Sequence, residues 1–244
     1  MQDWGWRVPF IAGVLIIPVA LYMRKNMPET LDTHATATHD SVAGVLGSLF
    51  KENLRPFLIA FALVASGTIA TYVLTYMTTY ALTTLKMSLS VSIAATLVFG
   101  LCTFIFSLVG GWLSDRIGRK PLIVWPKVFG LIAVYPAFLM IVANKDAATL
   151  LGVTAILTSV ASLSSVLLVV IPESMPKAVR SAGLSVAYSL AVTIFGGTAQ
   201  PIVTWLIHVT DDPVSPAWYL VLASIVGLVA VLMLPETKDK KLED

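Results

Sequence analysis

Long apolar runs separated by short polar connections dominate this sequence. Each run approaches the ~20 residues that an α-helix needs to cross the ~30 Å hydrocarbon core of a bilayer, so the pattern predicts membrane-spanning helices. We expect seven of them, over residues 6–23, 56–81, 89–113, 121–143, 148–171, 182–207 and 216–235. The chain is therefore predicted to be an all-α membrane protein.

The longest polar segment, residues 24–55, separates the first predicted span from the second. Its middle, residues 33–40, is rich in small and polar residues, as a flexible linker is. Residues 42–50 are apolar at helical spacing, which predicts a short helix lying on the inner membrane surface. His34 and His39 have no constellation of cysteine or carboxylate ligands around them, so we expect solvated histidines and neither a metal nor a cofactor.

The composition supports a membrane protein and argues against an enzyme. Hydrophobic residues make up 57% of the chain and charged residues 12%, whereas about 25% of an average soluble domain is charged. The single cysteine, Cys102, excludes an intramolecular disulfide. The sequence offers no metal cluster, nucleophile–base pair or paired intramembrane carboxylates, so we expect no catalysis, and no nucleic-acid partner.

Lysine and arginine are distributed unevenly between alternate connections. One side of the predicted membrane carries twelve of the sixteen cations: Arg24, Lys25, Lys51, Arg55, Arg116, Arg119, Lys120, Lys177, Arg180, Lys238, Lys240 and Lys241. The other side carries three, which are Arg7, Lys86 and Lys145. Because cytoplasmic connections are enriched in Lys and Arg, we expect the first set in the cytoplasm and the N-terminus outside.

Glycine and charged residues concentrate in one stretch, GGWLSDRIGRKP at residues 110–121. Three cations so close together are too costly to place in lipid, so we expect a wetted loop between two spans. The stretch resembles the signature loop of the major facilitator superfamily, G-x-x-x-D-R-x-G-R-K/R-P, which joins the second and third helices of a six-helix bundle. A generic basic loop is the alternative.

A short repeat indicates how the spans are grouped. Pro28-Glu29-Thr30 follows the first span and Pro235-Glu236-Thr237 follows the seventh, with six spans between them. Transporters of this superfamily have two six-helix halves. We therefore expect a major facilitator superfamily six-helix bundle, helices 7–12, plus the preceding helix 6, with five further helices upstream. The expected parts are helix 6 at 1–23, a cytoplasmic interdomain linker at 24–55, the bundle at 56–235 and a cytoplasmic tail at 236–244. A genuine seven-span protein is the alternative.

Two further motifs resemble one family of this superfamily, the metabolite:proton symporters. WGWRVPF at residues 4–10 opens the first span, and YSL at residues 188–190 is followed by IFGG at residues 194–197. Members of that family take up citrate and other tricarboxylates, 2-oxoglutarate, shikimate, betaine and proline. The polar stretch 71–80 and SPAW at residues 215–218 are most similar to the citrate/tricarboxylate members. The resemblance implies proton-coupled uptake of an organic acid.

Polar side chains on two predicted spans indicate a solute cavity. Hydroxyl groups recur every four residues along 68–80, and hydroxyls with one amide form a similar stripe along 185–204. Such groups can bind the carboxylate or hydroxyl groups of a solute, although small hydroxyl residues also serve close helix packing. The candidate substrate-binding residues are Thr71, Tyr72, Thr75, Tyr76, Lys127, Tyr188 and Gln200.

Lys127 is the only charge well inside a predicted span, about 9 Å past Pro121 at 1.5 Å per residue. Its long stem can snorkel back to the cytoplasmic interface. Alternatively, its ammonium faces the cavity and attracts an anionic substrate. No Asp or Glu lies in the middle of a predicted span, so we place the proton-coupling site in the upstream helices.

The superfamily resemblance also implies a charged gate on the cytoplasmic face. Glu173 and Arg180 flank six residues, similar to an E-x6-R element of related transporters, and Glu236 belongs to an acidic element after the last helix. In the family, these acids pair with arginines of the signature loop and lock the outward-open state. The implied pairs are Arg116 and Arg119 with Glu173 and Glu236, and Asp115 with Arg180 or a neighbouring helix N-terminus; Lys120 completes the set. Exposed charges that only hold topology, each pair worth about 0–1 kcal/mol, are the alternative.

These observations together predict half of a proton-coupled organic-acid symporter that works by alternating access in the inner membrane of the cell. Its expected partners are a small organic anion, protons, the lipid bilayer and the missing N-terminal helices. A proline/betaine-type osmolyte symporter is the rival of the same class. A non-transporting receptor or assembly subunit made from a truncated transporter is the rival from another class.

Overall fold

The computed structural model describes residues 4, 7–14, 16–26 and 42–236, and every regular element among them is helical. The chain divides into two units, residues 1–40 and residues 41–244. The predicted linker residues 27–41, with His34 and His39, and the tail residues 237–244 lie outside the described part.

The first unit contains two short helices, α1 (Arg7–Val14) and α2 (Ile16–Asn26). The predicted span 6–23 is thus helical on both sides of residue 15, which lies outside the described residues. With eight and eleven residues, each helix alone is shorter than a bilayer span requires.

The second unit holds six helical segments that are long and apolar enough to cross a membrane, which confirms the six predicted spans from 56 to 235. Four of these spans are single helices, and two are interrupted by a change of helix type. The elements are α3 (Val42–Lys51), α4 (Leu54–Thr83), α5 (Leu89–Ile117), α6 (Arg119–Asn144), α7 (Ala147–Leu163), the 3₁₀ turn η1 (Ser164–Val166), α8 (Leu167–Glu173), the 3₁₀ turn η2 (Lys177–Val179), α9 (Arg180–Ala191), the π-helical turn η3 (Val192–Gly196), α10 (Gly197–Thr210) and α11 (Ser215–Leu232).

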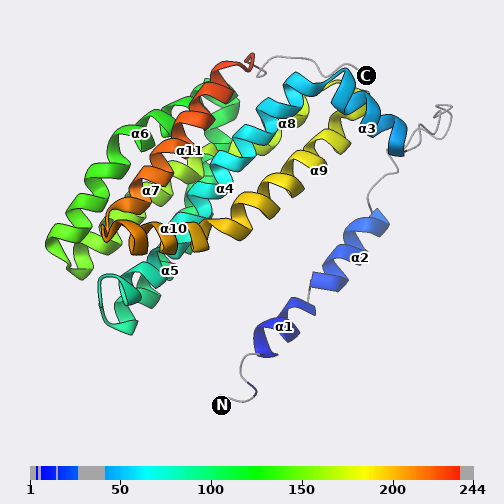
Figure 1. Ribbon diagram of the computed structural model, residues 1–244. Coiled ribbons are helices and arrows are strands. Elements are labelled where there is room, and N and C mark those ends of the chain that lie inside the picture. The colour runs from blue at the N-terminus through cyan, green and yellow to red at the C-terminus, as the bar shows by residue number, and fades with distance from the viewer. Residues whose placement is uncertain (1–3, 5–6, 15, 27–41, 237–244) are drawn as a thin grey trace. The chain divides into compact units, whose positions relative to one another are not determined.

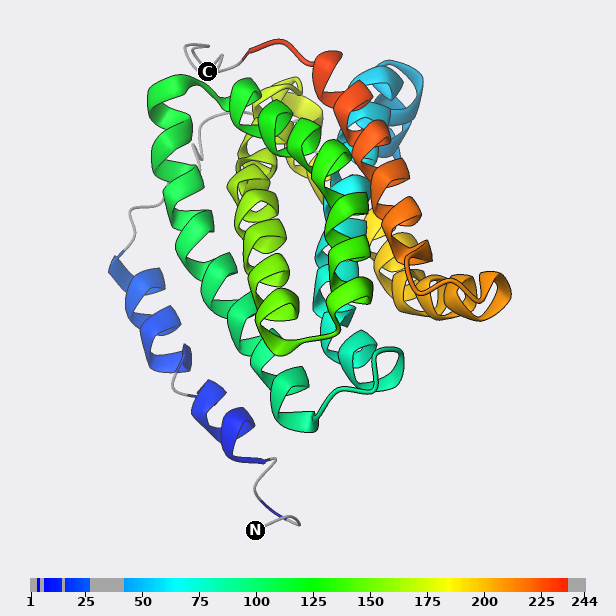
Figure 2. The same ribbon diagram turned by 90° about the vertical axis from the view of Figure 1, so that its left-hand side faces the viewer.

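Consecutive spans run antiparallel in one bundle, so their connections alternate between its two ends (Figures 1 and 2). At one end, the α5–α6 turn meets residues 173 and 232–236; we call this the Arg119 end. At the other, the Tyr80 end, the Tyr80 hydroxyl donates to the carbonyl of Pro213 at 2.6 Å. The α9–α10 span bends at η3 (Figure 1), as is common at π-helical turns.

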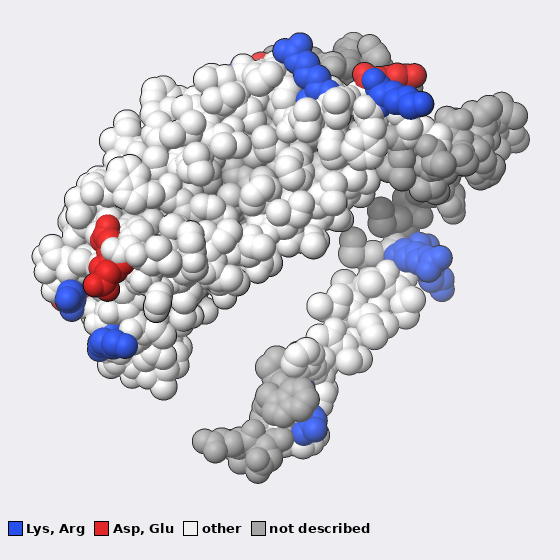
Figure 3. Space-filling view, viewed as in Figure 1, with Lys and Arg blue, Asp and Glu red and all other residues white. Residues whose placement is uncertain are grey.

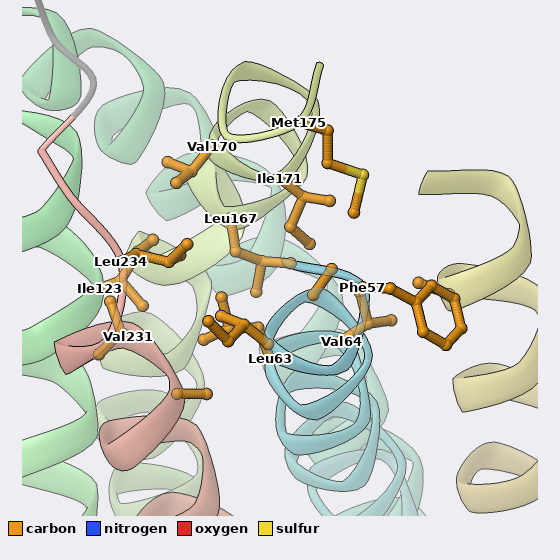
Figure 4. Close-up of a cluster of buried hydrophobic side chains, with 14 of the residues drawn as sticks. Phe57, Leu63, Val64, Ile123, Leu167, Val170, Ile171, Met175, Val231 and Leu234 are labelled. Atoms are coloured by element: carbon orange, nitrogen blue, oxygen red, sulfur yellow. The ribbon is translucent and has the colours of Figure 1, made fainter. Parts of the chain in front are cut away.

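Two clusters of buried apolar side chains fill the bundle. The cluster near the Arg119 end joins α4, α6, α8 and α11 through side chains such as Leu63, Ile123, Ile171 and Val231 (Figure 4). The short helix α3 belongs to it, because Leu49 is fully buried. The predicted helix at 42–50 is therefore present, and it packs on α4, η2 and α9 of the bundle. The second cluster, nearer the Tyr80 end, includes Val73, Met77, Phe138, Leu150 and Leu220.

The outer surface of the bundle is apolar between its two ends. Charged side chains gather at the ends on the face that Figure 3 displays, and the surface between them is uncharged. Large apolar side chains such as Leu97, Trp125 and Ile132 are exposed there. Contiguous apolar surface of this kind is typical of a protein whose helices face lipid, and it agrees with the predicted all-α membrane protein.

The stretch 110–121 is mostly helical, which corrects the predicted loop. Helix α5 continues to Ile117 and α6 begins at Arg119, so a single residue, Gly118, makes the turn. Gly118 has a φ of +107°, a conformation that side chains with a Cβ rarely adopt. The apolar run ends at residue 113, but polar residues can continue a helix into water. Helix α5 is therefore longer than the apolar part of its sequence.

Candidate substrate cavity and charged cluster

A cavity of about 600 Å³ lies among the spans of the second unit. Helices α4, α5, α6 and α7 contribute most of its wall, and η1, α8, α9, η3, α10 and α11 close parts of it. Several lining side chains are exposed in this chain, among them Thr71, Thr75, Tyr188 and Gln200, so the cavity is open on that side.

Six of the seven predicted substrate-binding residues line this cavity: Thr71, Tyr72, Thr75, Lys127, Tyr188 and Gln200. Tyr76 is the exception. Its ring is buried, and its hydroxyl is hydrogen-bonded to the hydroxyl of Thr204 at 3.0 Å. Tyr76 thus connects α4 to α10, because the bend of the α9–α10 span brings Thr204 against it.

Two of the lining threonines already use their hydroxyl protons. Thr71 donates to the carbonyl of Gly67 at 3.0 Å, and Thr75 donates to the carbonyl of Thr71 at 2.8 Å. Such bonds to the preceding turn are usual for threonine in membrane helices. The two hydroxyls therefore present lone pairs, and no proton, to the cavity.

Tyr72 is placed by a close approach to the π-helical turn η3. A Cβ atom at Gly196 would lie 2.9 Å from the Tyr72 ring and 3.3 Å from the Thr68 methyl group. Only a glycine at position 196 leaves enough room for the Tyr72 ring to stay where it is. π-helical turns occur often at functional sites, and this one lies directly behind a cavity side chain.

Lys127 lies inside the bundle, and its side chain does not snorkel to the Arg119 end. It is 7% exposed, and its Nζ donates to the Ser66 hydroxyl on α4 at 2.6 Å. Ser66 in turn donates to the carbonyl of Ala223 on α11 at 2.6 Å. Gly227 makes room for this chain of bonds, because a Cβ there would overlap Ser66 and lie 3.0 Å from Lys127 Cε.

The Lys127 ammonium has a neutral partner. The ion pairs among the described residues all involve Arg119, and none involves Lys127. No carboxylate belongs to the described lining of the cavity either. A buried ammonium is costly unless charges or hydrogen bonds compensate it, so this arrangement can hold an anion in the cavity.

Sequence reasoning missed several hydroxyls of the cavity wall. Ser66, which accepts a hydrogen bond from Lys127 but is not part of the cavity lining, was missed because its neighbours on α4 are apolar. Thr103, Thr158 and Ser164 do line the cavity. The signal for the last two was present, since residues 158–165, TSVASLSS, are rich in serine and threonine within an apolar span.

Arg119 is the centre of a charged cluster at its end of the bundle. Its Nε donates to Glu173 at 2.6 Å and its terminal nitrogen to Asp115 at 3.2 Å. Both Arg119 and Glu173 are largely shielded, with side chains 16% and 15% exposed. The predicted pairing of Arg119 with Glu173 is therefore present in the structure. It joins the first turn of α6 to the end of α8.

Glu236 contacts backbone groups of the signature stretch. Its carboxylate accepts hydrogen bonds from the backbone N–H groups of Arg119, at 3.0 Å, and Lys120, at 3.1 Å. These are free donors at the start of α6, where a negative charge also complements the helix dipole. Lys120 reciprocates by donating to the carbonyls of Leu232 and Leu234 after α11.

One implied pairing is corrected. Asp115 lies in the last turn of α5 and pairs with Arg119, one helical turn further along the chain, and not with Arg180. Arg180 donates to the carbonyl of Met175 at 3.4 Å, within its own connection. The Arg116 guanidinium lies 4.1 Å from the centre of the Trp112 ring on the same helix. Trp112 and Arg116 share one face of α5 because they are four residues apart on it, whereas the Asp115–Arg119 pair spans the Gly118 turn between α5 and α6.

Comparison with known proteins identifies the family. The model of a family described as sugar (and other) transporter matches residues 23–244. The chain belongs to this family, within the major facilitator superfamily. With its apolar spans, it is therefore a multi-pass cell membrane protein.

Several relatives of this transporter-family chain are curated proteins of known role. It is 34% identical to a citrate-proton symporter of Klebsiella pneumoniae over 96% of this chain and 53% of the relative. It is 29% identical to the ectoine/proline transporter ProP of Corynebacterium glutamicum, over 99% of this chain and 50% of that one. It is 30% identical to the alpha-ketoglutarate permease of Escherichia coli K12, over 96% and 54%. The chain thus spans about half the length of the curated relatives it matches.

Proposed function

We propose that this chain is the C-terminal half of a proton-coupled symporter that imports an organic acid such as citrate or a dicarboxylate across the inner membrane of the cell. The observation that carries the proposal is Lys127, a buried ammonium that lines the cavity and has the neutral Ser66 as its partner. An organic anion would supply the charge that the cavity wall lacks.

The groups around Lys127 suit the rest of such a substrate. Tyr72 and Tyr188 bring phenol hydroxyls to the cavity, and Gln200 brings an amide. These groups donate hydrogen bonds to carboxylates and hydroxyls without adding charge. The exposed side of the cavity, with Thr71, Thr75 and Gln200, would face the other half of the transporter, so that alternating access exposes the site to each side in turn.

Proton coupling is proposed from the relatives, two of which are citrate-proton symporters. The described cavity wall contains no carboxylate. The group that carries the coupled proton is therefore expected in the part of the transporter that precedes this chain, as a carboxylate or histidine within a span.

The charged cluster would serve as the cytoplasmic latch. In the proposed cycle, Asp115, Arg119 and Glu173 hold α5, α6 and α8 together in one conformation, and Glu236 ties the end of α11 to α6. Arg116, Lys120 and Arg180 belong to the same surface. A change of about 1.4 kcal/mol between two conformations alters their ratio about tenfold, so these contacts suffice to bias the cycle.

A zwitterionic osmolyte is the second candidate substrate. Four aromatic side chains line the cavity: Tyr72, Phe99, Phe129 and Tyr188. Aromatic faces attract quaternary ammonium groups such as that of betaine. Parallel uptake assays with glycine betaine distinguish the two candidates.

The test is uptake of radiolabelled citrate, 2-oxoglutarate and glycine betaine by the protein as its gene encodes it, reconstituted in liposomes with an alkaline interior. Lys127→Met should raise the KM for the transported acid at least about tenfold, because a hydrogen bond to a charged group is lost. The matched control is Lys86→Met, an exposed lysine at the Tyr80 end, which should leave uptake unchanged.

Three results would count against the proposal. An unaltered KM of Lys127→Met for every acid tested would remove Lys127 from the site. Uptake that persists after a protonophore collapses the pH gradient would reject proton coupling. Accumulation of betaine without accumulation of either acid would replace the organic acid by an osmolyte.

A further inference from the structure

One wall of the cavity carries three buried hydroxyls that have no hydrogen-bond partner among the described residues. They are Thr103 on α5, Thr158 on α7 and Ser164 in η1. Thr158 is 1% exposed and Ser164 is 5% exposed. The three residues come from neighbouring elements, since α5 packs along α7 and η1 (Figure 2). We call these three residues together the hydroxyl wall.

The backbone fixes the position of this wall. At Gly110, a Cβ would lie 2.8 Å from the carbonyl oxygen of Leu163, the last residue of α7. Helix α5 thus approaches α7 at the point where α7 changes into the 3₁₀ turn. Because a 3₁₀ turn advances three residues per turn, it changes the direction in which Ser164 points relative to the preceding α-helix.

The hydroxyl wall differs from the α4 side of the cavity. On α4, Thr71 and Thr75 donate their protons to carbonyls of their own helix. Thr103, Thr158 and Ser164 make no such bond, so their hydroxyl protons and lone pairs are unused, with the oxygen atoms buried in this conformation. Leaving a buried hydroxyl without a partner costs about 1–3 kcal/mol, and a polar ligand group bound in the cavity would remove that cost.

We infer that the hydroxyl wall is a second binding subsite, which holds a second carboxyl group of the substrate whose first carboxylate lies at Lys127. The inference rests on the proposed function and narrows it to acids with at least two carboxyl groups. A monocarboxylate at Lys127 would leave the hydroxyl wall without a partner. A second ammonium is not needed, because hydroxyls that both donate and accept bind a carboxyl group in either protonation state.

The experiment compares two threonines of the same helix. Thr158→Val removes the hydroxyl from the cavity wall and keeps the shape of the side chain. Thr154→Val is the matched control: Thr154 lies one turn earlier on α7, is 0% exposed and also has no hydrogen-bond partner, but it is not part of the cavity lining. Ser164→Ala tests a second member of the wall. Thr158→Ser restores the hydroxyl.

The assay is uptake by the reconstituted protein as its gene encodes it, with citrate and 2-oxoglutarate as acids with several carboxyl groups and glycine betaine as the monocarboxylate. Thr158→Val and Ser164→Ala should each raise the KM for the acids about tenfold with kcat within about twofold of wild type, because the lost bonds serve binding. Thr158→Ser should recover most of the affinity, and Thr154→Val should match wild type.

The outcomes separate the two proposals. If wild type transports citrate or 2-oxoglutarate and Thr158→Val has the same KM as Thr154→Val, the hydroxyl subsite is wrong and the organic-acid function stands. Failure of Thr158→Ser to recover affinity would also overturn the subsite, because shape and not the hydroxyl would then decide. If wild type transports neither acid, the organic-acid function is wrong, and the subsite with it.

Discussion

Arg119 and Glu173 form a short ion pair, with 2.6 Å between Nε and the carboxylate, although 54 residues separate them in the chain. Arg119 stands in the first turn of α6 and Glu173 is the last residue of α8. Both side chains are mostly shielded from solvent, so the pair is screened less than a surface salt bridge. A conformational change that separates α6 from α8 at this end of the bundle would break this pair.

In the organic-acid symporter proposed above, Arg119→Ala and Glu173→Gln should each lower uptake of the transported acid by the full-length gene product about tenfold, with little change in its binding or in expression. Removing one partner of a shielded pair leaves the other charge poorly compensated and shifts the balance between conformations. Uptake in liposomes measures the first effect, and binding of the same acid in detergent measures the second.

The matched control for this latch is Arg55→Ala, an exposed arginine in the first turn of α4. It should transport like wild type. If both Arg119→Ala and Glu173→Gln show wild-type uptake, these charges only set the orientation of the chain in the membrane and do not act as a latch.

Two adjacent glycines of α5 should respond very differently to alanine. A Cβ at Gly110 would lie 2.8 Å from the backbone oxygen of Leu163, whereas a Cβ at Gly111 meets nothing within 4 Å. Backbone atoms cannot move aside cheaply, so Gly110→Ala should lower the melting temperature of the purified protein by several degrees. Gly111→Ala should keep or slightly raise it, because alanine favours a helix by up to about 1 kcal/mol. Equal melting temperatures would contradict the close approach of α5 to α7.

The spans and their order could be predicted because lipid exposure imposes a simple rule on composition. The rule fails at the ends of helices. Residues 114–116 are polar yet extend α5, and Glu236 binds backbone N–H groups that no sequence pattern displays. The Arg119–Glu173 pair was accessible through resemblance, whereas the Asp115–Arg119 pair depended on knowing that the turn is a single residue.

The cavity could be predicted only in part. The sequence shows which residues share one face of a helix, but it does not show which other helices that face contacts. Tyr72 and Tyr76 are one turn apart on α4, yet Tyr72 lines the cavity and Tyr76 bonds to Thr204. The α9–α10 span, which bends at η3, places Gly196 against Tyr72 and Thr204 against Tyr76. Lys127 was open to two interpretations for the same reason, since its partner Ser66 lies on another helix.

The charge asymmetry makes a prediction about sidedness. Lys86 and Lys177 are exposed residues in connections of opposite parity. In a Cys102→Ala background, Lys86→Cys should react with a membrane-impermeant thiol reagent added to intact cells, and Lys177→Cys should react only after the cells are opened, because the richer set of cations stays in the cytoplasm. Labelling of Lys177→Cys from outside would contradict the predicted orientation and support the opposite one.

Gly196 should affect the substrate site and not the fold. A Cβ there would lie 2.9 Å from Cε2 of Tyr72. This atom belongs to the far end of a side chain, which can rotate away, in contrast to the backbone that Gly110 faces. Gly196→Ala should therefore displace Tyr72 within the cavity, raise the KM for the transported acid severalfold and leave the melting temperature nearly unchanged. Gly197→Ala, where a Cβ meets nothing within 4 Å, is the control and should behave like wild type.

A double-mutant cycle decides whether Gly196 acts through Tyr72. Once Tyr72→Ala has removed the ring, the Cβ of Gly196→Ala meets only the Thr68 methyl group, at 3.3 Å, and should add little further increase in KM. Non-additivity of this kind is the signature of two residues in direct contact. Full additivity of the two substitutions would mean that the alanine disturbs the cavity by another route, such as a change in the π-helical turn itself, and that the tyrosine is not held in place by the glycine.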